Sequence, residues 1–244
     1  MRSKYLGKDT RYKLETYSPS FLDAVKRNLP KQVESFFGHD YWNAYEFSYL
    51  NSSNQPVLES LEIKIPITSI DTVESKSLKL YLASFFNEKF NNPSKAYALI
   101  KKDIGKLLNT EVSVTKKVKY KEPPKSILLN NATQKISKNK VIKFEGFRSI
   151  CPVTSQPDWA NIYFYSADDF IDPKPLIKLL KSYRTRGDFH EACIESIFFS
   201  MIMDMNLQDL TVYGRFLRRG GIDINPIRSM SRKMIFQNFR DTIQ

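Results

Sequence analysis

Hydrophobic and polar residues alternate in three segments of the first half of the chain: residues 43–50, 58–69 and 111–120. Because successive side chains of a strand point to opposite faces, this alternation predicts three half-buried strands. Residues 51–56 are rich in asparagine and serine and end in proline, so they predict a turn between the first two strands.

Between the second and third strands the hydrophobic spacing changes to that of a helix. Residues 75–90 predict a first helix, and its apolar face consists of Leu78, Leu82, Phe85 and Phe86. Residues 91–94 interrupt the pattern with two asparagines and a proline. Ser94 is the predicted N-cap of a second helix over residues 95–108.

The second half of the chain repeats this order of patterns. Strands are predicted at residues 141–150, 158–166 and 210–217, and helices at residues 174–183 and 189–205. The last helix has an apolar stripe of Ile194, Ile197, Phe198, Met201 and Met205. Both halves therefore have the order strand, strand, helix, helix, strand, which indicates an internal duplication.

The duplication predicts an α+β fold in which each half has a mostly antiparallel sheet with helices packed on one face. Residues 1–120 are the predicted N-terminal half and residues 141–244 the predicted C-terminal half. Residues 121–140, which are rich in proline, asparagine and lysine, are the predicted linker.

The composition is that of a globular protein, with 41% hydrophobic and 13% aromatic residues. The first residues contain no apolar stretch, so we expect no signal peptide, and no run approaches the length of a membrane span. The chain has two cysteines, Cys151 and Cys193, too few for a disulfide framework. A cytoplasmic location without membrane association is the expectation.

The net charge of +12 raises the question of a polyanionic partner. Between residues 101 and 143, twelve lysines face only Asp103, Glu111 and Glu122. A solvated basic face is the simpler interpretation. An RNA-binding module whose tyrosines and phenylalanines stack on bases is an alternative, although no known RNA-binding motif is present.

Cys151 and Asp158 lie seven residues apart around two prolines, after a predicted strand. A thiol can act as a nucleophile, although only about 3% of an unperturbed thiol is ionised at pH 7. A desolvated aspartic acid could donate a proton, and Trp159 could supply the apolar wall. The simpler interpretations are a small buried hydrophobic residue for Cys151 and a turn or cap residue for Asp158.

His190 and Glu191 open the last predicted helix, where an imidazole and a carboxylate could hold the edge of a flat polar ligand. The structural alternative is a capping box formed by Asp188 and Glu191. Residues 74–79 contain Glu74, Ser75, Lys76, Ser77 and Lys79, which could pair a carboxylate with a purine-like edge and lysines with phosphates. The structural alternative is the exposed first turn of an amphipathic helix, in which Glu74 complements the helix dipole.

Arg218, Arg219, Gly220 and Gly221 combine phosphate-binding guanidinium groups with glycines that permit close backbone approach. A glycine turn beside surface charge is the alternative. Neither a GxGxxG fingerprint nor a Walker loop occurs. Cys151, Cys193 and His190 could also form a three-ligand zinc site, which would indicate a zinc-dependent hydrolase.

Four segments resemble the NADPH-dependent 7-cyano-7-deazaguanine reductases, the nitrile reductases of queuosine biosynthesis, in their long duplicated form. They are residues 74–81 (ESKSLKLY), 151–159 (CPVTSQPDW), 189–198 (FHEACIESIF) and 218–226 (RRGGIDINP). The resemblance implies two tandem tunnelling-fold (T-fold) units, usually in a homodimer, with the site between the halves. The zinc-dependent cyclohydrolases share this fold, which keeps the zinc hydrolase as an alternative by analogy.

The resemblance also implies the reaction: NADPH reduces the nitrile of a small deazapurine to an aminomethyl group through a covalent thioimide, with no direct contact to nucleic acid. Cys151 would be the nucleophile and Asp158 the proton donor. The implied substrate contacts are Val73, Glu74, Ser75, His190 and Glu191, with Phe189 shielding the substrate. The implied NADPH contacts are Ser75, Lys76, Arg219 and Gly220, with Lys79 as a further candidate.

Overall fold

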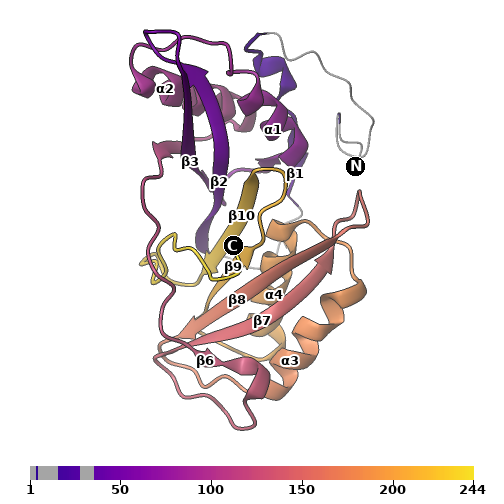
Figure 1. Ribbon diagram of the computed structural model, residues 1–244. Coiled ribbons are helices and arrows are strands. Elements are labelled where there is room, and N and C mark those ends of the chain that lie inside the picture. Colours follow the sequence, from indigo (N-terminus) through magenta and orange to yellow (C-terminus); the bar gives the residue numbers. More distant parts are fainter. Residues whose placement is uncertain (1–3, 5–15, 28–35) are drawn as a thin grey trace. The chain divides into compact units, whose positions relative to one another are not determined.

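The computed structural model describes Lys4, residues 16–27 and residues 36–244, which form two compact units (Figure 1). The first unit comprises the described residues up to Arg27, Tyr41–Lys119 and Arg218–Asp223. The second comprises residues 36–40, Tyr120–Leu217 and Ile224–Gln244. The predicted division into residues 1–120, a linker over residues 121–140, and residues 141–244 stays a prediction.

The first unit contains the strands that the alternating patterns predicted. They are β2 (Phe37–Leu50, within this unit from Tyr41), β3 (Pro56–Pro66) and β5 (Ser113–Lys116), in the sheet order β5-β3-β2. β3 and β5 are antiparallel, with Leu61 opposite Lys116. A small second sheet of β1 (Ala24–Lys26) and β4 (Asp71–Val73) was not predicted, because strands of three residues carry too little pattern.

The first helix, α1 (Ser75–Ala83), ends seven residues earlier than predicted. The backbone of Leu50, at the end of β2, exchanges hydrogen bonds with Glu88 and Phe90, so this segment pairs with a strand end and cannot continue the helix. The predicted apolar face is therefore only partly correct. Leu78, Leu82 and Phe85 are buried, whereas Phe86 is 42% exposed.

The second helix, α2 (Pro93–Leu108), begins two residues earlier than predicted. Its N-cap is Asn92, whose side-chain oxygen accepts a hydrogen bond from the backbone N–H of Ser94 at 2.9 Å. Ser94 as N-cap was therefore wrong. Proline is favoured in the first turn because it has no N–H to leave unsatisfied, and Pro93 occupies that position.

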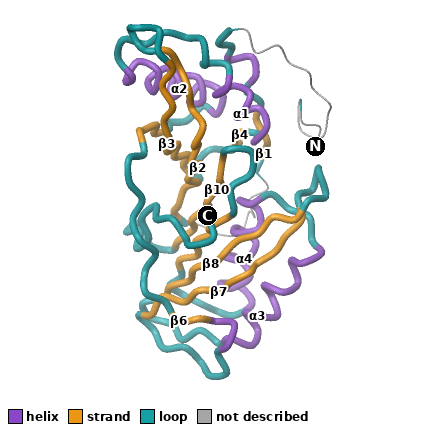
Figure 2. The backbone as a smooth tube through the Cα atoms, in the orientation of Figure 1, coloured by secondary structure: helices purple, strands orange, loops and turns teal. Residues whose placement is uncertain are grey.

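The described part of the second unit contains the start of β2 and five further strands in the order β10-β9-β8-β7-β6. Figure 2 labels β10, β8, β7 and β6 among them. The five strands are β6 (Ile127–Leu128), β7 (Lys140–Ile150), β8 (Pro157–Ser166), β9 (Thr211–Phe216) and β10 (Ile222–Ser229, within this unit from Ile224). Neighbouring strands are antiparallel except for β6 and β7. The helices are α3 (Pro173–Ser182) and α4 (His190–Asp204), close to their predicted ranges.

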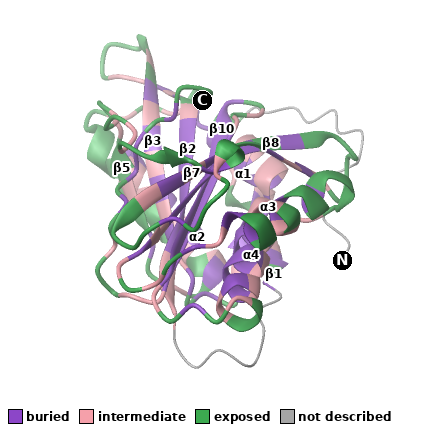
Figure 3. Cartoon of the chain, turned by 90° about the horizontal axis from the view of Figure 1, so that it is seen from below, coloured by how far each residue is buried: buried purple, intermediate pink, exposed green. Residues whose placement is uncertain are grey.

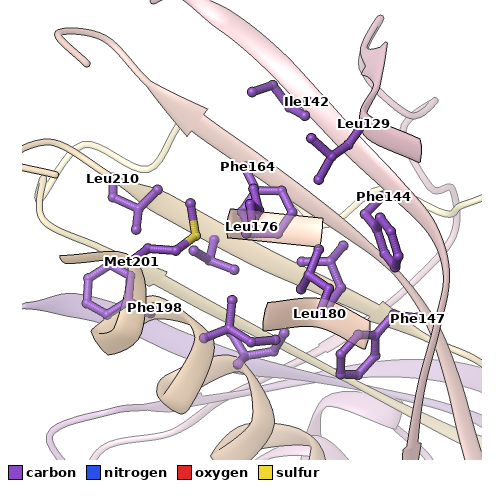
Figure 4. Close-up of a cluster of buried hydrophobic side chains, with 14 of the residues drawn as sticks. Leu129, Ile142, Phe144, Phe147, Phe164, Leu176, Leu180, Phe198, Met201 and Leu210 are labelled. Carbon is purple, nitrogen blue, oxygen red and sulfur yellow. The ribbon is translucent and has the colours of Figure 1, made fainter. Parts of the chain in front are cut away.

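Helices α3 and α4 cover one face of the β7–β9 strands and bury the main core of this unit (Figure 4). Strand residues such as Phe144, Phe164 and Val212 pack there against Leu176 and Met201 of the helices. Figure 3 shows α4 as mostly buried, while α3 has an exposed outer side. The predicted stripe of α4 is confirmed at Ile194, Ile197, Phe198 and Met201, which are buried, and Met205 packs against the cluster as a partly buried residue.

The predicted fold class is confirmed: antiparallel strands dominate, and the described residues of each unit form two α-helices. Strand β10 is the main element that the sequence did not predict. All eight of its residues are buried, including Asp223, Asn225 and Arg228. No helix among the described residues is long and apolar enough to cross a membrane.

Candidate functional site

Cys151 follows the last residue of β7, as predicted, and the connection to β8 brings it close to Asp158. The backbone N–H of Cys151 donates a hydrogen bond to the carbonyl of Gln156 at 2.9 Å, so the pairing of the strands continues one step past Ile150. Ser149 lies opposite Asp158 in the ladder. Because residues two apart share a face, the side chains of Cys151 and Asp158 are diagonal neighbours on one face.

This face is the one that the helices cover. Phe147 and Ala160, which have the same orientation as Ser149 and Asp158, belong to the core under α3 and α4. Asp158 is consequently only 4% exposed, and it lies within a strand, so its interpretation as a turn or cap residue is wrong. Cys151, at the end of the strand, is partly exposed, so its interpretation as a small buried hydrophobic residue is wrong.

Trp159 does not provide the apolar wall for Asp158. Adjacent residues of a strand point to opposite faces, and Trp159 is 38% exposed on the other side of the sheet. There the guanidinium of Arg148 lies 5.8 Å from the Trp159 ring centroid. The surroundings of the Asp158 carboxyl come from the helix layer instead.

His190, the first residue of α4, faces Asp158. Its Nε2 lies 3.4 Å from Oδ2 of Asp158, and its ring stacks on Phe216 with 4.0 Å between the centroids. Its Nδ1 is buried and has no hydrogen-bond partner among the described residues. The structure thus places Cys151, Asp158 and His190 at one end of the second unit, with Glu191 buried in the first turn of the helix.

The predicted capping box at the start of α4 is wrong. The N-cap is Phe189, which makes no side-chain capping bond. The carboxylate of Asp188 instead lies 2.6 Å from Nε of Arg186, and its backbone N–H donates to the carbonyl of Ile150. These tertiary contacts hold Asp188 one residue before the cap position.

Cys193 belongs to the hydrophobic core and is fully buried. Desolvation by burial raises the pKa of its thiol to about 12, so it stays protonated at neutral pH. A zinc ligand must be a thiolate. In the described part of the chain, no three His, Cys, Asp or Glu side chains are grouped closely enough to hold a metal ion. The zinc hydrolase interpretation is therefore not favoured.

Glu74 forms the N-cap of α1 in the first unit. Its carboxylate accepts hydrogen bonds from the backbone N–H groups of Lys76 at 2.7 Å and Ser77 at 2.8 Å. Glu74 is 2% exposed, so the interpretation as an exposed first turn is wrong for this residue. A buried carboxylate at this point satisfies two backbone donors and complements the helix dipole.

Replacing Glu74 with alanine is expected to lower the free energy of unfolding by about 1–2 kcal/mol, because two backbone N–H groups lose their partner. Urea unfolding followed by circular dichroism measures this change. Glu111→Ala is the control, since Glu111 forms an exposed ion pair with Lys101 and its loss should change the stability by about 0.5 kcal/mol or less. Equal effects of the two variants would contradict the capping role.

A hollow of about 250 Å³ in the first unit brings together three residues of the implied cofactor site: Lys76 and Lys79 of α1, and Gly220. Apolar side chains, among them Phe47 and Leu80, form part of its lining. Ser75 and Arg219, which the resemblance also implied, are not among its lining residues. Two cations beside an apolar wall suit a ligand that has both phosphate and ring groups.

The two glycines at the hollow are required by their positions. Gly220 has φ +58°, and a Cβ there would lie 3.3 Å from Nζ of Lys79. Gly221 has φ +78°, and a Cβ there would collide with a carboxylate oxygen of Glu46. A side chain at either position would fill the space between the backbone and these charged groups. Arg218 lies 5.2 Å above the Tyr45 ring, outside this hollow's lining.

Sequence analysis missed two residues: Glu46, which lines the hollow of the first unit, and Phe216, which contacts His190 in the second unit. Glu46 is the one exposed residue of β2, and nothing in the sequence pattern distinguishes it from an ordinary solvated residue of a strand. Phe216 ends β9 and matches an ordinary core position. Only the tertiary structure places the first beside Gly221 and the second under the His190 ring.

Part of the basic charge between residues 101 and 143 is compensated by tertiary contacts. Four lysines form ion pairs: Lys101 with Glu111, Lys116 with Glu59, Lys117 with Glu62, and Lys143 with Glu145 and Asp241. The charge of this segment is therefore not a continuous unpaired strip.

A thiol and a carboxylic acid on one sheet face are the groups that covalent catalysis at an unsaturated carbon requires. The fold and the site thus define a two-unit α+β protein in which a partly exposed thiol and a buried carboxyl group lie on one sheet face. Two family models match the chain: "Nitrile reductase, 7-cyano-7-deazaguanine-reductase N-term" over residues 12–116 and "QueF-like protein" over residues 157–234. The chain belongs to this family of 7-cyano-7-deazaguanine reductases, which confirms the resemblance.

Curated relatives agree over nearly the whole chain. A protein of Coxiella burnetii (strain Dugway 5J108-111) is 36% identical over 263 residues, which cover 96% of this chain and 94% of the relative. A protein of Hahella chejuensis is 34% identical and covers 92% of both chains. A third, from Colwellia psychrerythraea, is 34% identical and covers 92% of this chain. All three are named NADPH-dependent 7-cyano-7-deazaguanine reductase.

Proposed function

We propose that the protein is an oxidoreductase that uses NADPH to reduce 7-cyano-7-deazaguanine to 7-aminomethyl-7-deazaguanine, a step in queuosine biosynthesis for tRNA modification. Membership of the reductase family supports the reaction. The structural observation that carries the proposal is the arrangement of Cys151, Asp158 and His190 at one end of the second unit. A nucleophile, an acid and a group that orients the acid lie together there.

The first step uses the thiol and the acid. Sγ of Cys151, as the thiolate, adds to the nitrile carbon while the carboxylic acid of Asp158 gives its proton to the nitrile nitrogen. One C–N π bond breaks, a C–S bond forms, and the substrate becomes a thioimide. A C=N bond next to sulfur accepts hydride far more readily than a nitrile does, so one difficult step is divided into easier ones.

The burial of Asp158 suits it to be a proton donor, because an apolar environment favours the uncharged form of a carboxylic acid. His190 lies close enough to orient that carboxyl group. After the first reduction the C–S bond breaks, and its electron pair returns to the sulfur of Cys151. The imine that remains is reduced to the amine, so the reaction moves four electrons in total.

NADPH, when bound, supplies the hydride for both reductions. The lysine-lined hollow of the first unit fits its phosphates, since Lys76 and Lys79 provide cations and Gly220 leaves a space that a Cβ would fill. Ser75 and Arg219 are further proposed contacts to NADPH. Ion pairs to flexible lysines permit release of the oxidised form, which the use of two successive molecules requires.

The substrate contacts implied by the family resemblance, Val73, Glu74, Ser75, His190 and Glu191, stay predictions. We also propose a homodimer in the cytoplasm, supported by the same resemblance. Light scattering on the purified protein tests the dimer.

Incubation of the protein with NADPH and 7-cyano-7-deazaguanine tests the function directly. The expected result is the consumption of two NADPH molecules for each nitrile and the appearance of the primary amine in the mass spectrum. A protein that binds the nitrile without oxidising NADPH would contradict the proposal. Tight, salt-sensitive binding of RNA together with that result would support the RNA-binding alternative.

Replacing Lys79 with alanine is expected to raise KM for NADPH about tenfold and leave kcat nearly unchanged, because a charge-assisted contact to phosphate is lost in ground state and transition state alike. Steady-state kinetics at two salt concentrations measure this effect, which should shrink at high salt. Lys95→Ala on the exposed side of α2 is the matched control. An unchanged KM for NADPH in Lys79→Ala would show that the cofactor binds elsewhere.

A further inference from the structure

The imidazole of His190 lies flat on the phenyl ring of Phe216. The two centroids are 4.0 Å apart and the planes differ by 8°, so this is a parallel stack. Phe216 is fully buried, whereas the side chain of His190 is 13% exposed. One face of the His190 imidazole therefore packs against a phenyl ring that has no access to solvent.

Gly214 makes room for the Phe216 ring. It lies two residues earlier in β9 and thus on the same face of the strand. A Cβ at Gly214 would lie 2.7 Å from Cδ1 of Ile194 and 2.8 Å from Cε2 of Phe216, closer than carbon atoms approach. The space above this glycine is thus already occupied by the edge of the phenyl ring and by the first turns of α4. The ring is fixed between the strand and the helix that begins with His190.

Side chains also hold the backbone of Phe216. Its N–H donates to Oδ1 of Asn225 at 3.1 Å, and its carbonyl accepts from Nε2 of Gln244 at 2.7 Å. The same Gln244 amide donates to Asn225 at 2.8 Å and accepts from the guanidinium of Arg215 at 2.7 Å. Phe216 is consequently fixed at both its backbone and its ring.

The stack fixes the plane of the imidazole ring. In this plane Nε2 of His190 lies 3.4 Å from Oδ2 of Asp158. Tilting the ring out of the plane by rotation about its Cβ–Cγ bond would break the parallel contact and turn Nε2 away from the carboxyl. Two flat rings in contact resist this rotation, whereas an aliphatic side chain of similar size would allow it.

We propose that Phe216 is a positioning residue for the acid chemistry: it holds the His190 ring so that Nε2 orients the carboxyl of Asp158 toward the reacting nitrogen. The proposal rests on the proposed function, in which Asp158 protonates the substrate. It assigns no contact between Phe216 and the substrate. Gly214, Asn225 and Gln244 act through Phe216.

The test is the rate at which the thioimide forms when the nitrile is added without NADPH, followed by intact-mass spectrometry. Phe216→Leu removes the flat ring and is expected to slow this step about tenfold, because the acid is no longer held in its productive position. Phe216→Tyr keeps the ring and is expected to restore most of the rate. If Phe216→Leu does not fold, Phe216→Met replaces it, since its unbranched side chain fills the same space.

Phe164→Leu is the matched control, because Phe164 is buried in the same core and makes no ring contact with His190 among the described residues. It should lower the melting temperature by an amount similar to Phe216→Leu and leave the rate unchanged. Equal rate losses in both variants, or no rescue by tyrosine, would overturn the proposal and leave only a packing role.

A second measurement separates this proposal from the proposed function. The chain has two histidines, so the imidazole proton signals of His190 can be followed by NMR with His39 as the reference. The phenyl ring current should shift the His190 signals upfield, and Phe216→Leu should remove that shift while Phe164→Leu keeps it. A wild-type protein that shows this shift but forms no thioimide would disprove the function alone. Absence of the shift in the wild-type protein would disprove the positioning role of Phe216.

Discussion

Replacement of Cys151 by alanine is expected to reduce turnover by at least about a thousandfold, because no other group can form the C–S bond that activates the nitrile. The structure makes Cys151 the suitable thiol of the two. It is partly exposed at the end of β7, whereas Cys193 is fully buried and burial raises the pKa of its thiol to about 12. Without the sulfur, hydride would have to add to the nitrile itself.

Intact-mass spectrometry provides a direct readout of this step. Mixing the wild-type protein with 7-cyano-7-deazaguanine should add the mass of the substrate, and peptide mapping should place it on Cys151. Cys193→Ala is the matched control, and it should still form the adduct because Cys193 lies in the core. Normal reduction by Cys151→Ala, or an adduct on Cys193, would disprove the covalent mechanism.

Replacement of Arg228 by methionine is expected to lower the free energy of unfolding by about 3–5 kcal/mol, because it leaves two buried carboxylates without a cation. Arg228 is fully buried in the second unit. Its Nη2 lies 2.9 Å from Oδ1 of Asp40 and 2.6 Å from Oε1 of Glu195, and its Nη1 donates to the carbonyl of Ile227 at 2.8 Å. Desolvation lowers the pKa of Arg228, but Asp40 and Glu195 outweigh it and the net shift is upward.

This ion-pair cluster also anchors the helix of the candidate site. Glu195 lies one turn after Glu191 in α4, so its bond to Arg228 ties the first turns of the helix to β10. In the Arg228→Met variant the carboxylates of Asp40 and Glu195 can be neutralised only by protonation. The loss of stability should therefore become smaller as the pH is lowered, since protonation of the folded protein removes the uncompensated charges.

Urea unfolding at several pH values measures both effects. Lys101→Met is the control, because Lys101 forms an exposed ion pair with Glu111 and should change the stability by less than about 1 kcal/mol. A triple variant that also replaces Asp40 and Glu195 with apolar residues should recover most of the loss. A change of less than about 1 kcal/mol in Arg228→Met would show that the cluster contributes little net stability.

The same cluster explains why sequence analysis did not predict β10. Residues 222–229 contain aspartate, asparagine, proline and arginine, a composition that indicates a loop. The strand is buried because each charged side chain has partners that are distant in sequence. Asp223 accepts hydrogen bonds from Asn43 and Tyr45, and Arg228 binds Asp40 and Glu195. No local pattern can indicate such partners.

The sequence alone determined those features of the protein that depend on local periodicity and on short motifs. It predicted six strands (β2, β3, β5, β7, β8 and β9), the existence of four helices, the position of Cys151 at a strand end, and the reductase family, because hydrophobic period and motif spacing are properties of neighbouring residues. The tertiary structure alone decided that α1 ends where Leu50 pairs with Glu88 and Phe90, and that Glu74 is a buried cap. It also decided that His190 stacks on Phe216 and faces Asp158, since residues 58 positions apart in β8, α4 and β9 meet only when the sheet and helix pack together.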